Sequence, residues 1–545
     1  MSSGVESFRQ LSPSEFFYRN REIAGFSNPA RAVYQTVREF IENSLDATEV
    51  HGILPVITLR ISREDPFNPN HITIQVEDNG IGVPPQFIPD AFGRVLYSSK
   101  YKFRQTRGMY GLGAKMAILY AQLTTGKPFE IYSSTRKTRY IYYYKLMIDV
   151  KRNEPQILEM ASWEKRSKWH GTIVKLTIEG EWSRRVRDYV AVYIKRTAII
   201  TPYADITAIL PSVEKEDEYE VLRFPRVTSM LPRPPKEAKP HPLGIDLEML
   251  KMMINETGAK TVLSFLTSEF QRIGEVTATR ILKNAGIDPD KPPRTLDDDE
   301  LQRLYKAMRE EKYWAPTDEP LSPIGEELIR IGLKEILRPE FIATASRKPS
   351  SYSGHPFIVE GGIAYGGELA SRLDEIAQDS VKGETGPYIV LLRYANKIPL
   401  LYDEKTDVMW SIVDPSKFPW RSVYKLEPTD TVAVLIHICS TKVPYKGVGK
   451  ESVANVEEVE SEVRLLAQEL ARKLREYIQR KKRVQEARQK LSLFLRYIPE
   501  VAASLAAIAG NGRGTPDPSI QKELTEKMRE IALAKIKLSE DEASA

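Results

Sequence analysis

Three short patterns follow one another between residues 28 and 115, and their order limits how this chain of 545 residues can fold. The first is a helical pattern, the second is a strand that ends in a turn, and the third is a glycine-rich turn that leads into another helix. Helices and strands that alternate within so short a span are typical of a layered domain in which helices cover a sheet. Each pattern also carries polar residues or glycines that can serve a binding site.

The first pattern predicts a helix that begins at Asn28-Pro29, where the Asn side chain caps a free amide and the proline needs no hydrogen-bond partner. Glu39, Asn43 and Asp46 lie at i, i+4 and i+7 and therefore share one face. Such a face is usually solvated. The alternative is that Asn43 offers a carbonyl oxygen to Mg²⁺ beside phosphates and that Glu39 takes a proton from water. The opposite, buried face has residues at helical spacing: Val33, Val37, Phe40, Ile41 and Ser44.

The second pattern predicts a strand over residues 71–77 that is followed by a buried carboxylate. Apolar residues alternate with polar ones, and Asp78 has the parity of the apolar set, so its side chain should point to the buried side. A buried charge needs a hydrogen-bond donor, and the exocyclic amine of adenine would supply one. The alternative is an ordinary turn, in which Gly80 and Gly82 only supply positive φ angles.

The third pattern is the turn Arg107-Gly108-Met109-Tyr110-Gly111-Leu112-Gly113-Ala114-Lys115, which runs into an apolar helical pattern. Free amides at the start of a helix attract phosphate, and Lys115 adds a positive charge. The turn is not a P-loop, because no Gly-Lys-Ser/Thr follows at the required spacing. It is not a dinucleotide fingerprint either, because no strand leads directly into it. The turn therefore indicates a phosphate site of another kind.

The three patterns together resemble the GHKL ATPases, which include gyrase, heat-shock chaperones, histidine kinases and mismatch-repair ATPases. The later Gly-Thr of that family is matched by Gly171-Thr172, which precedes a strand-like run. The resemblance implies that Glu39 is the general base, that Asn43 holds Mg²⁺ with the ATP phosphates, and that Asp78 reads adenine. It assigns the wrapping of the phosphates to Gly108 through Lys115. It also places further residues at the nucleotide: Asp46, Gly80, Gly82 and Thr172. Ser99 and Lys100 would lie in a lid over it.

Composition narrows the class of protein. A content of 41% hydrophobic and 28% charged residues supports real cores in a soluble chain, and a net charge of +5 permits a polyanionic partner without demanding one. The single cysteine, Cys439, excludes an internal disulfide framework, and the six histidines lack metal-ligand spacing, so we expect no zinc site. The polar start and the short apolar stretches predict a cytoplasmic protein without a membrane partner.

Pattern changes along the chain predict a multidomain α+β protein. An N-terminal arm carries three adjacent aromatic residues, Phe16, Phe17 and Tyr18, which either pack on the next domain or, as the resemblance favours, reach a second copy. A proline-rich linker at 231–242 precedes a helical part that resembles a helix-two-turn-helix module. That module usually contacts nucleic acid, although a purely architectural insert is equally consistent. The predicted parts are an arm (1–27), an α/β-sandwich ATPase domain (28–230), the helical domain (243–312), an α/β transducer with a long helix (313–500) and a tail (501–545).

A lysine in the transducer is the remaining candidate for the site. Gyrase-type proteins carry, after a strand of their second domain, a lysine that reaches the γ-phosphate of ATP. The resemblance makes Lys442 the candidate here, with Lys446 and Lys397 as alternatives, and an ordinary surface lysine remains the plain interpretation. A cation that touches the phosphate lost on hydrolysis would convert the state of ATP into a domain angle.

The order of ATPase fold, helical insert and transducer resembles the B subunits of the DNA topoisomerase VI family. The resemblance implies an ATP- and Mg²⁺-dependent enzyme in which two B chains dimerise on ATP around one DNA duplex. A separate A subunit, in an A₂B₂ heterotetramer, would cut the DNA, and a second duplex would pass through the break. The alternatives are a DNA clamp of the mismatch-repair type, which predicts no helical insert, and a chaperone-like clamp. A histidine kinase would need a phosphoacceptor histidine, and residues 1–27 contain none.

Overall fold

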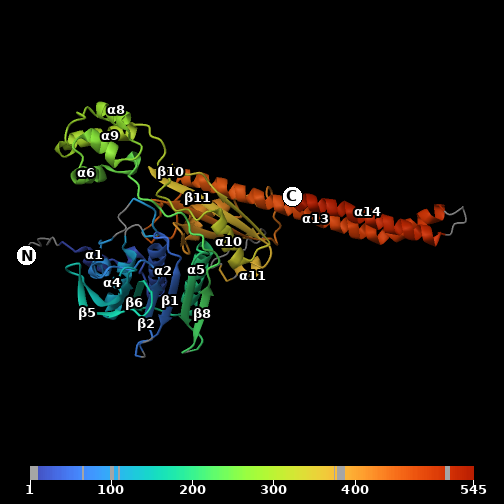
Figure 1. The fold of residues 1–545 in the computed structure, drawn as a ribbon, viewed down its shortest axis with the longest axis horizontal. Coiled ribbons are helices and arrows are strands. Elements are labelled where there is room, and N and C mark those ends of the chain that lie inside the picture. Colours follow the sequence, from blue (N-terminus) through green and yellow to red (C-terminus); the bar gives the residue numbers. More distant parts are fainter. Residues whose placement is uncertain are drawn as a thin grey trace, which may run out of the picture.

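The computed structural model describes residues 10–63, 65, 67–98, 103–108, 111–215, 217–373, 375–376, 387–447, 449–509 and 516–544. Its described part contains two sheets, a separate group of helices and a long helical hairpin that projects from the body (Figure 1). Four predicted site residues, Ser99, Lys100, Met109 and Tyr110, lie outside the described residues.

The first sheet has eight strands in the order β5-β4-β3-β6-β2-β1-β7-β8, and only the β1–β7 pair is parallel. The predicted strand over residues 71–77 and the strand-like run after Gly171-Thr172 are both strands of this sheet, β2 and β6. Strand β5 is mostly exposed and so lacks the alternation that signals a half-buried strand. The strands are β1 (Val56–Ser62), β2 (His71–Asp78), β3 (Phe129–Ser134), β4 (Tyr140–Asp149), β5 (Glu154–Glu164), β6 (Gly171–Glu179), β7 (Asp205–Pro211) and β8 (Tyr219–Phe224).

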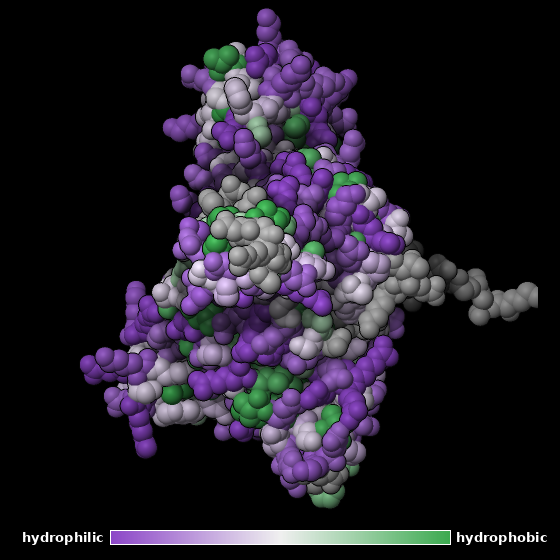
Figure 2. Space-filling model, turned by 90° about the vertical axis from the view of Figure 1, so that its right-hand side faces the viewer, coloured by the Kyte–Doolittle hydropathy of each residue, from purple (hydrophilic) through white to green (hydrophobic). Residues whose placement is uncertain are grey.

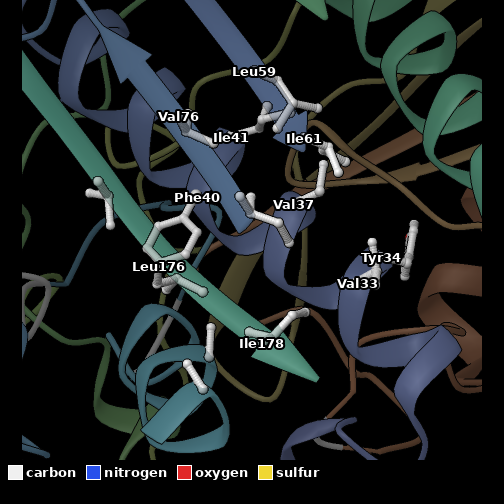
Figure 3. Close-up of a cluster of buried hydrophobic side chains, with 14 of the residues drawn as sticks. Val33, Tyr34, Val37, Phe40, Ile41, Leu59, Ile61, Val76, Leu176 and Ile178 are labelled. Carbon is white, nitrogen blue, oxygen red and sulfur yellow. The ribbon is translucent and has the colours of Figure 1, made fainter. Parts of the chain in front are cut away.

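Three helices, α2 (Pro29–Glu49), α4 (Gly113–Thr125) and α5 (Arg184–Ile200), pack together on this sheet. The Asn28 side chain accepts a hydrogen bond from the Arg31 amide at 2.8 Å, which confirms the predicted cap of α2. The apolar face of α2 meets β1, β2 and β6, as Figure 3 shows for Val37, Phe40 and Leu176. The polar face is not solvated as a lone helix would be, because Glu39 is also buried.

The N-terminal arm lies against its own domain where it is described. Its helix α1 (Pro13–Arg19) contacts α4, and the hydroxyls of Ser12 and Ser14 both donate to the carbonyl of Val150, at 2.6 and 2.7 Å. Phe17 packs on the core of the first sheet, whereas Phe16 is 43% exposed. A short 3₁₀ turn, Arg21–Ala24, leads from α1 towards α2, and two small elements, Pro85–Phe87 and α3 (Ile88–Gly93), follow β2. Contact with a second copy stays a prediction.

The helical part has a core of its own. Asp297 caps α9 in a reciprocal arrangement with Glu300, so the acidic run at 297–300 starts this helix. Two arginines of the helical part make internal contacts: Arg280 pairs with Glu311 at 2.8 Å, and Arg294 donates to the Thr257 carbonyl at 3.1 Å. The helices are α6 (Leu247–Glu256), α7 (Val262–Glu269), α8 (Glu275–Ala285) and α9 (Asp298–Glu310), with 3₁₀ turns at Pro242–Gly244 and Pro293–Thr295.

The second sheet has six strands, and its central strands are buried on both faces. One face packs on α12 and α13, and the other on α10, α11 and the end of α5, so that the cores of both sheets meet at α5. The elements are α10 (Glu326–Leu337), β9 (Phe341–Ser346), β10 (Ser350–Tyr352), β11 (His355–Tyr365), α11 (Leu369–Leu373), β12 (Tyr388–Ala395), β13 (Ile398–Pro399), a 3₁₀ turn (Glu404–Thr406), α12 (Val408–Val413) and β14 (Thr431–Ser440).

The predicted long helix is longer than its pattern indicated. Helix α13 (Glu457–Ala509) continues through Pro499 into the region predicted as a tail, and it forms a hairpin with α14 (Pro518–Ser544). Its first half buries an apolar stripe on the second sheet. Among the described residues, α13 alone is long and apolar enough over an 18-residue window to meet the criteria for a membrane span. Only 17% of that window is buried within the chain.

Candidate nucleotide-binding site

A cavity of about 630 Å³ lies where the three sequence patterns meet, between α2, the end of β2 and the turn before α4. The predicted site residues among its lining are Asn43, Asp46, Asp78, Gly82, Gly111, Ala114, Lys115 and Thr172. Apolar side chains that sequence reasoning missed form much of the remaining wall: Val50, Ile81, Val83, Phe87 and Phe92. Ile81, Val83 and Phe87 follow the Asp-x-Gly turn directly, and their apolar character next to a binding motif was the available signal.

Asp78 lies at the floor of the cavity and is 6% exposed, as its parity on the strand predicted. One carboxylate oxygen accepts from the amides of Gly80 at 2.8 Å and Thr172 at 3.2 Å, and the other accepts from the Ser44 hydroxyl at 3.2 Å. Burial raises the pKa of Asp78 to about 6, although these three donors oppose the rise. The floor therefore holds a carboxylate that would gain from one more donor.

Gly171 and Gly82 allow the strand ends to close on this floor. Gly171 has a φ of +137°, and a Cβ there would overlap the Asp78 carbonyl. Gly82 has a φ of +69°, and a Cβ there would overlap the Ser134 carbonyl. Both positions therefore need glycine for conformation and for space. The structure thus brings the Gly-Thr pair beside Asp78, although 94 residues separate Thr172 from Asp78 in the sequence.

Glu39 lies beside the cavity and faces the start of α4. Its side chain is 7% exposed, and one oxygen accepts a hydrogen bond from the Gln35 amide at 3.0 Å. A Cβ on Gly113 would overlap the other oxygen, so only glycine lets the start of α4 lie against this carboxylate. Glu39 from the first sequence pattern and Gly113 from the third are therefore in van der Waals contact.

The start of α4 has the character of an anion site. Its N-cap residue, Leu112, makes no side-chain capping hydrogen bond, so the amides of the first turn are not satisfied by the N-cap side chain. Lys115 is 3% exposed and donates to the Tyr97 carbonyl. Its charge is therefore held at the rim of the cavity, next to amides that favour negative charge.

The α2 side chains that line the cavity differ in their availability for a metal ion. Asp46 pairs with Arg107 at 3.1 Å, so its charge is already balanced. Asn43 is neutral and half-buried at the cavity wall. Within the described ranges, no group of three or more His, Cys, Asp or Glu residues is placed to hold a metal. An ion here would fit one protein oxygen beside phosphate oxygens, which is the coordination that Mg²⁺ often has with nucleotides.

The loop after β14 brings a lysine to the glycine-rich turn, but not the predicted one. The Lys450 amine donates to the Arg107 carbonyl at 3.2 Å, and the Arg38 guanidinium donates to the Gly449 carbonyl at 3.1 Å. Lys442 is exposed, and Lys446 donates to the Thr406 carbonyl of its own domain. Sequence reasoning missed Lys450, for which the preceding pair of glycines, Gly447 and Gly449, was the only signal.

The chain is similar to proteins of known families. Residues 28–147 match the family "Histidine kinase-, DNA gyrase B-, and HSP90-like ATPase", and residues 316–490 match "Topoisomerase VI B subunit, transducer". The B subunits of type 2 DNA topoisomerase 6 from Saccharolobus islandicus and Saccharolobus solfataricus are each 47% identical over 539 residues, covering 98% of this chain and 97% of theirs. The ATPase region of Saccharomyces cerevisiae topoisomerase II has a TM-score of 0.39 at 10% identity, over 85% of this chain and 96% of that one. The chain therefore belongs to the family of type 2 DNA topoisomerase 6 B subunits, with a GHKL ATPase domain and a transducer.

Proposed function

We propose that this ATP-driven topoisomerase subunit works as a nucleotide-operated gate in an A₂B₂ heterotetramer. Two copies close on ATP around one DNA duplex, an A subunit cuts the DNA, and a second duplex passes through the break, which relaxes supercoils. Hydrolysis then resets the gate. The observation that carries the proposal is the cavity itself, because a buried carboxylate and the start of α4 line it. Near it, Lys450 from the transducer loop binds the first residue of the glycine-rich turn.

Each wall of the cavity has a distinct task in this proposal. The Asp78 carboxylate accepts from the exocyclic amine of adenine, and the apolar wall covers the ring. The amides at the start of α4 and Lys115 hold the phosphates. Asn43 would hold Mg²⁺, which supplies charge neutralisation at the phosphates when it is bound. Glu39, oriented by Gln35, takes a proton from the attacking water.

Lys450 is our proposed contact to the γ-phosphate, in preference to Lys442. Two α2 arginines hold its loop at the ATPase domain, because Arg38 binds the Gly449 carbonyl and Arg31 pairs with Glu451. Asp407 holds the same loop at the transducer core, since its carboxylate accepts from the Val453 amide at 2.8 Å. The loop thus contacts both domains, so that a change at the terminal phosphate would alter their relative angle.

The far end of the helical hairpin is our proposed contact surface for the A subunit. Figure 2 faces the end of this rod and shows hydrophobic surface there. Exposed side chains on the second half of α13 are Leu493, Phe494, Tyr497, Val501, Leu505 and Ile508. An apolar patch of this kind marks an interaction site, and the charged residues between these positions favour a protein partner over a bilayer. Within this proposal the protein acts in the cytoplasm.

The experiment that tests the function measures the steady-state ATPase rate of the purified chain alone, with supercoiled DNA, and with DNA plus the A subunit. We expect the rate to rise only with both, together with relaxation of the plasmid. A rate that DNA raises without the A subunit would favour a DNA clamp, and a rate indifferent to both would favour a chaperone-like clamp. In the same assay Phe494→Asp should lose the response to the A subunit while the rate of the chain alone is retained.

Asp78→Asn should weaken ATP binding at least about tenfold and also stabilise the nucleotide-free protein. The side-chain oxygen of the new asparagine can still accept hydrogen bonds from the amides of Gly80 and Thr172. Its NH₂ group then faces the exocyclic amine of adenine, so two donors would meet. Burial raises the pKa of Asp78 to about 6, above its value in the unfolded chain. The stability that protonated Asp78 contributes is therefore fully present below about pH 4, and it is lost as the pH rises through about 6.

The gain in stability should consequently depend on pH. The rise of the Asp78 pKa to about 6 corresponds to about 3 kcal/mol, so at pH 8 we expect Asp78→Asn to raise the free energy of unfolding by about 1–3 kcal/mol. At pH 4 the variant and the wild type should be alike. Denaturant midpoints at both pH values, with equilibrium binding of ATP at pH 8, check the prediction. Equal midpoints at pH 8, or unchanged ATP affinity, would refute it.

A further inference from the structure

A two-residue turn of the transducer reaches into the ATPase domain. Strands β12 and β13 pair as a hairpin, and its turn residues, Asn396 and Lys397, have φ angles of 47° and 65°. Both are in the left-handed region, which a tight hairpin turn requires. Their side chains are 2% and 5% exposed. A lysine at a hairpin turn usually points to water, so the burial of Lys397 needs a reason.

Lys397 completes a line of buried charges that ends at the nucleotide cavity. Its amine donates to Glu49 at 3.2 Å and to the Ser322 hydroxyl at 2.7 Å. The other Glu49 oxygen accepts from Arg107 at 2.6 Å and from the Tyr203 hydroxyl at 2.8 Å. Arg107 also pairs with Asp46, which lines the cavity. Arg107 is the first residue of the glycine-rich turn, so the line joins the transducer to that turn.

The backbone just before the glycine-rich turn is held from the same side. The side-chain amide of Asn396 donates to the Thr106 carbonyl at 3.3 Å, and the Gln105 side-chain oxygen accepts from the backbone amide of Ser322 at 2.6 Å. The Gln105 amide donates to the Pro320 carbonyl at 2.9 Å. The two residues before Arg107, Gln105 and Thr106, are therefore held by contacts from residues 320–322 and the hairpin turn.

The hairpin turn is itself anchored in the core of the second sheet. The Lys397 amide donates to His437 at 2.9 Å, and the other ring nitrogen of His437 lies 2.8 Å from Glu360. Glu360 accepts from the amides of Ile324 and Gly325 at 2.6 and 2.8 Å. His437 and Glu360 are fully buried. Lys397 therefore moves with the transducer core as a unit.

The charges in this line balance. Two carboxylates, Asp46 and Glu49, face two cations, Arg107 and Lys397, and all four side chains are at most 10% exposed. Burial raises the pKa of Glu49, but the charges of Arg107 and Lys397 outweigh it and hold that pKa below its usual value. Without Lys397, one buried cation would serve two buried carboxylates, which is costly. Arg107, which already pairs with both carboxylates, would then be their sole cationic partner in this line, and its side chain and the turn that follows it would shift.

We propose that Lys397 is a positioning residue for ATP binding: its ion pair with Glu49 fixes Arg107, and with it the phosphate-binding turn, only at one angle between transducer and ATPase domain. The proposal rests on the nucleotide site proposed above. Because coupling of two equilibria is reciprocal, a transducer angle that favours the ion pair raises ATP affinity, and bound ATP favours that angle by the same factor. Partners that rotate the transducer thereby control nucleotide binding.

The test compares four proteins in the full-length chain: wild type, Lys397→Met, Glu49→Gln and the double variant. Equilibrium affinity for a non-hydrolysable ATP analogue and KM and kcat for ATP are measured separately. We expect each single variant to weaken affinity at least about tenfold, because a buried charge loses its partner, with a smaller change in kcat. The double variant restores charge balance and should bind within a few-fold of wild type. Lys397→Arg should retain most of the affinity.

Two controls separate a positioning role from a structural one. Lys417→Met removes an exposed lysine of the same domain and should bind ATP as the wild type does. A lysine that only stabilises the fold would lower the denaturant midpoint of Lys397→Met and leave the ATP affinity of the folded protein unchanged, so a single variant with wild-type affinity would overturn the proposal. A double variant that bound ATP as weakly as the single variants would also overturn it, because restored charge balance should return Arg107 to its position. If Asp78→Asn also left ATP affinity unchanged, the proposed nucleotide site would be wrong, and the result would not bear on the ion pair.

Discussion

Glu39→Gln is expected to lower ATP turnover at least about 100-fold and to leave ATP affinity within a few-fold of wild type. The side-chain amide of Gln35 can still donate to the oxygen of the new glutamine. The carboxamide of that glutamine has nearly the volume of the carboxylate it replaces, so it fits beside Gly113 at the start of α4. What is lost is the ability to take a proton from water. Single-turnover hydrolysis and equilibrium binding of a non-hydrolysable analogue measure the two effects separately.

The matched control for this prediction is Glu22→Gln, which changes the same group on an exposed turn and should leave turnover unchanged. Normal turnover in Glu39→Gln would remove Glu39 as the base. A loss of binding of the same size as the loss of turnover would instead make Glu39 a ground-state contact to the nucleotide. A variant that binds without hydrolysing should also hold two copies together, which size-exclusion chromatography with ATP would detect.

Lys450→Met should reduce turnover by about 100- to 1,000-fold, because a preorganised cation at developing negative charge contributes this much in other active sites. Its loop is fastened to α2 through Arg38 and to the transducer through Asp407, so loss of the lysine charge should leave the loop in place. Binding of ADP, which has no γ-phosphate, should be unchanged. ATP hydrolysis and ADP binding, measured side by side, check both statements.

The comparison that decides this assignment is Lys442→Met. Lys442 is exposed on the same loop, whereas the Lys450 amine already lies 3.2 Å from the first carbonyl of the glycine-rich turn. If Lys442→Met reduced turnover and Lys450→Met did not, the interpretation from sequence would stand and ours would be wrong. Equal effects of both would indicate that the loop as a whole, and no single ammonium group, supports hydrolysis.

The parts of the site that the sequence predicted depend on local rules. The cap at Asn28, the buried face of α2 and the burial of Asp78 each follow from spacing within one element. Periods of 3.6 and 2 hold wherever an element packs on a core, so they can be read without knowledge of its neighbours. The motif order then indicated the GHKL family, which the comparisons confirm.

The parts that sequence reasoning missed depend on partners far along the chain. Strand β5 has an exposed pattern and forms because β4 offers it a ladder. Lys450 reaches Arg107 across 343 positions, and Lys397 reaches Glu49 across 348. No periodicity connects such residues, and the sequence favoured Lys442, with Lys446 and Lys397 as alternatives, over Lys450. Their difference is one of burial and of which carbonyl or carboxylate lies within reach.

The chain alone, then, determined the class of fold, the ATPase family and the residues around Asp78, because hydrophobic spacing and glycine placement act within a few residues. Only the tertiary structure decided that α5 joins the separate cores of the two sheets and which lysines lie at the glycine-rich turn. It also showed that the polar face of α2, which a lone helix would expose to solvent, is part of a buried charge network. The physical reason is that a charge is stabilised or destabilised by whatever surrounds it, and those surroundings exist only once distant segments have packed together.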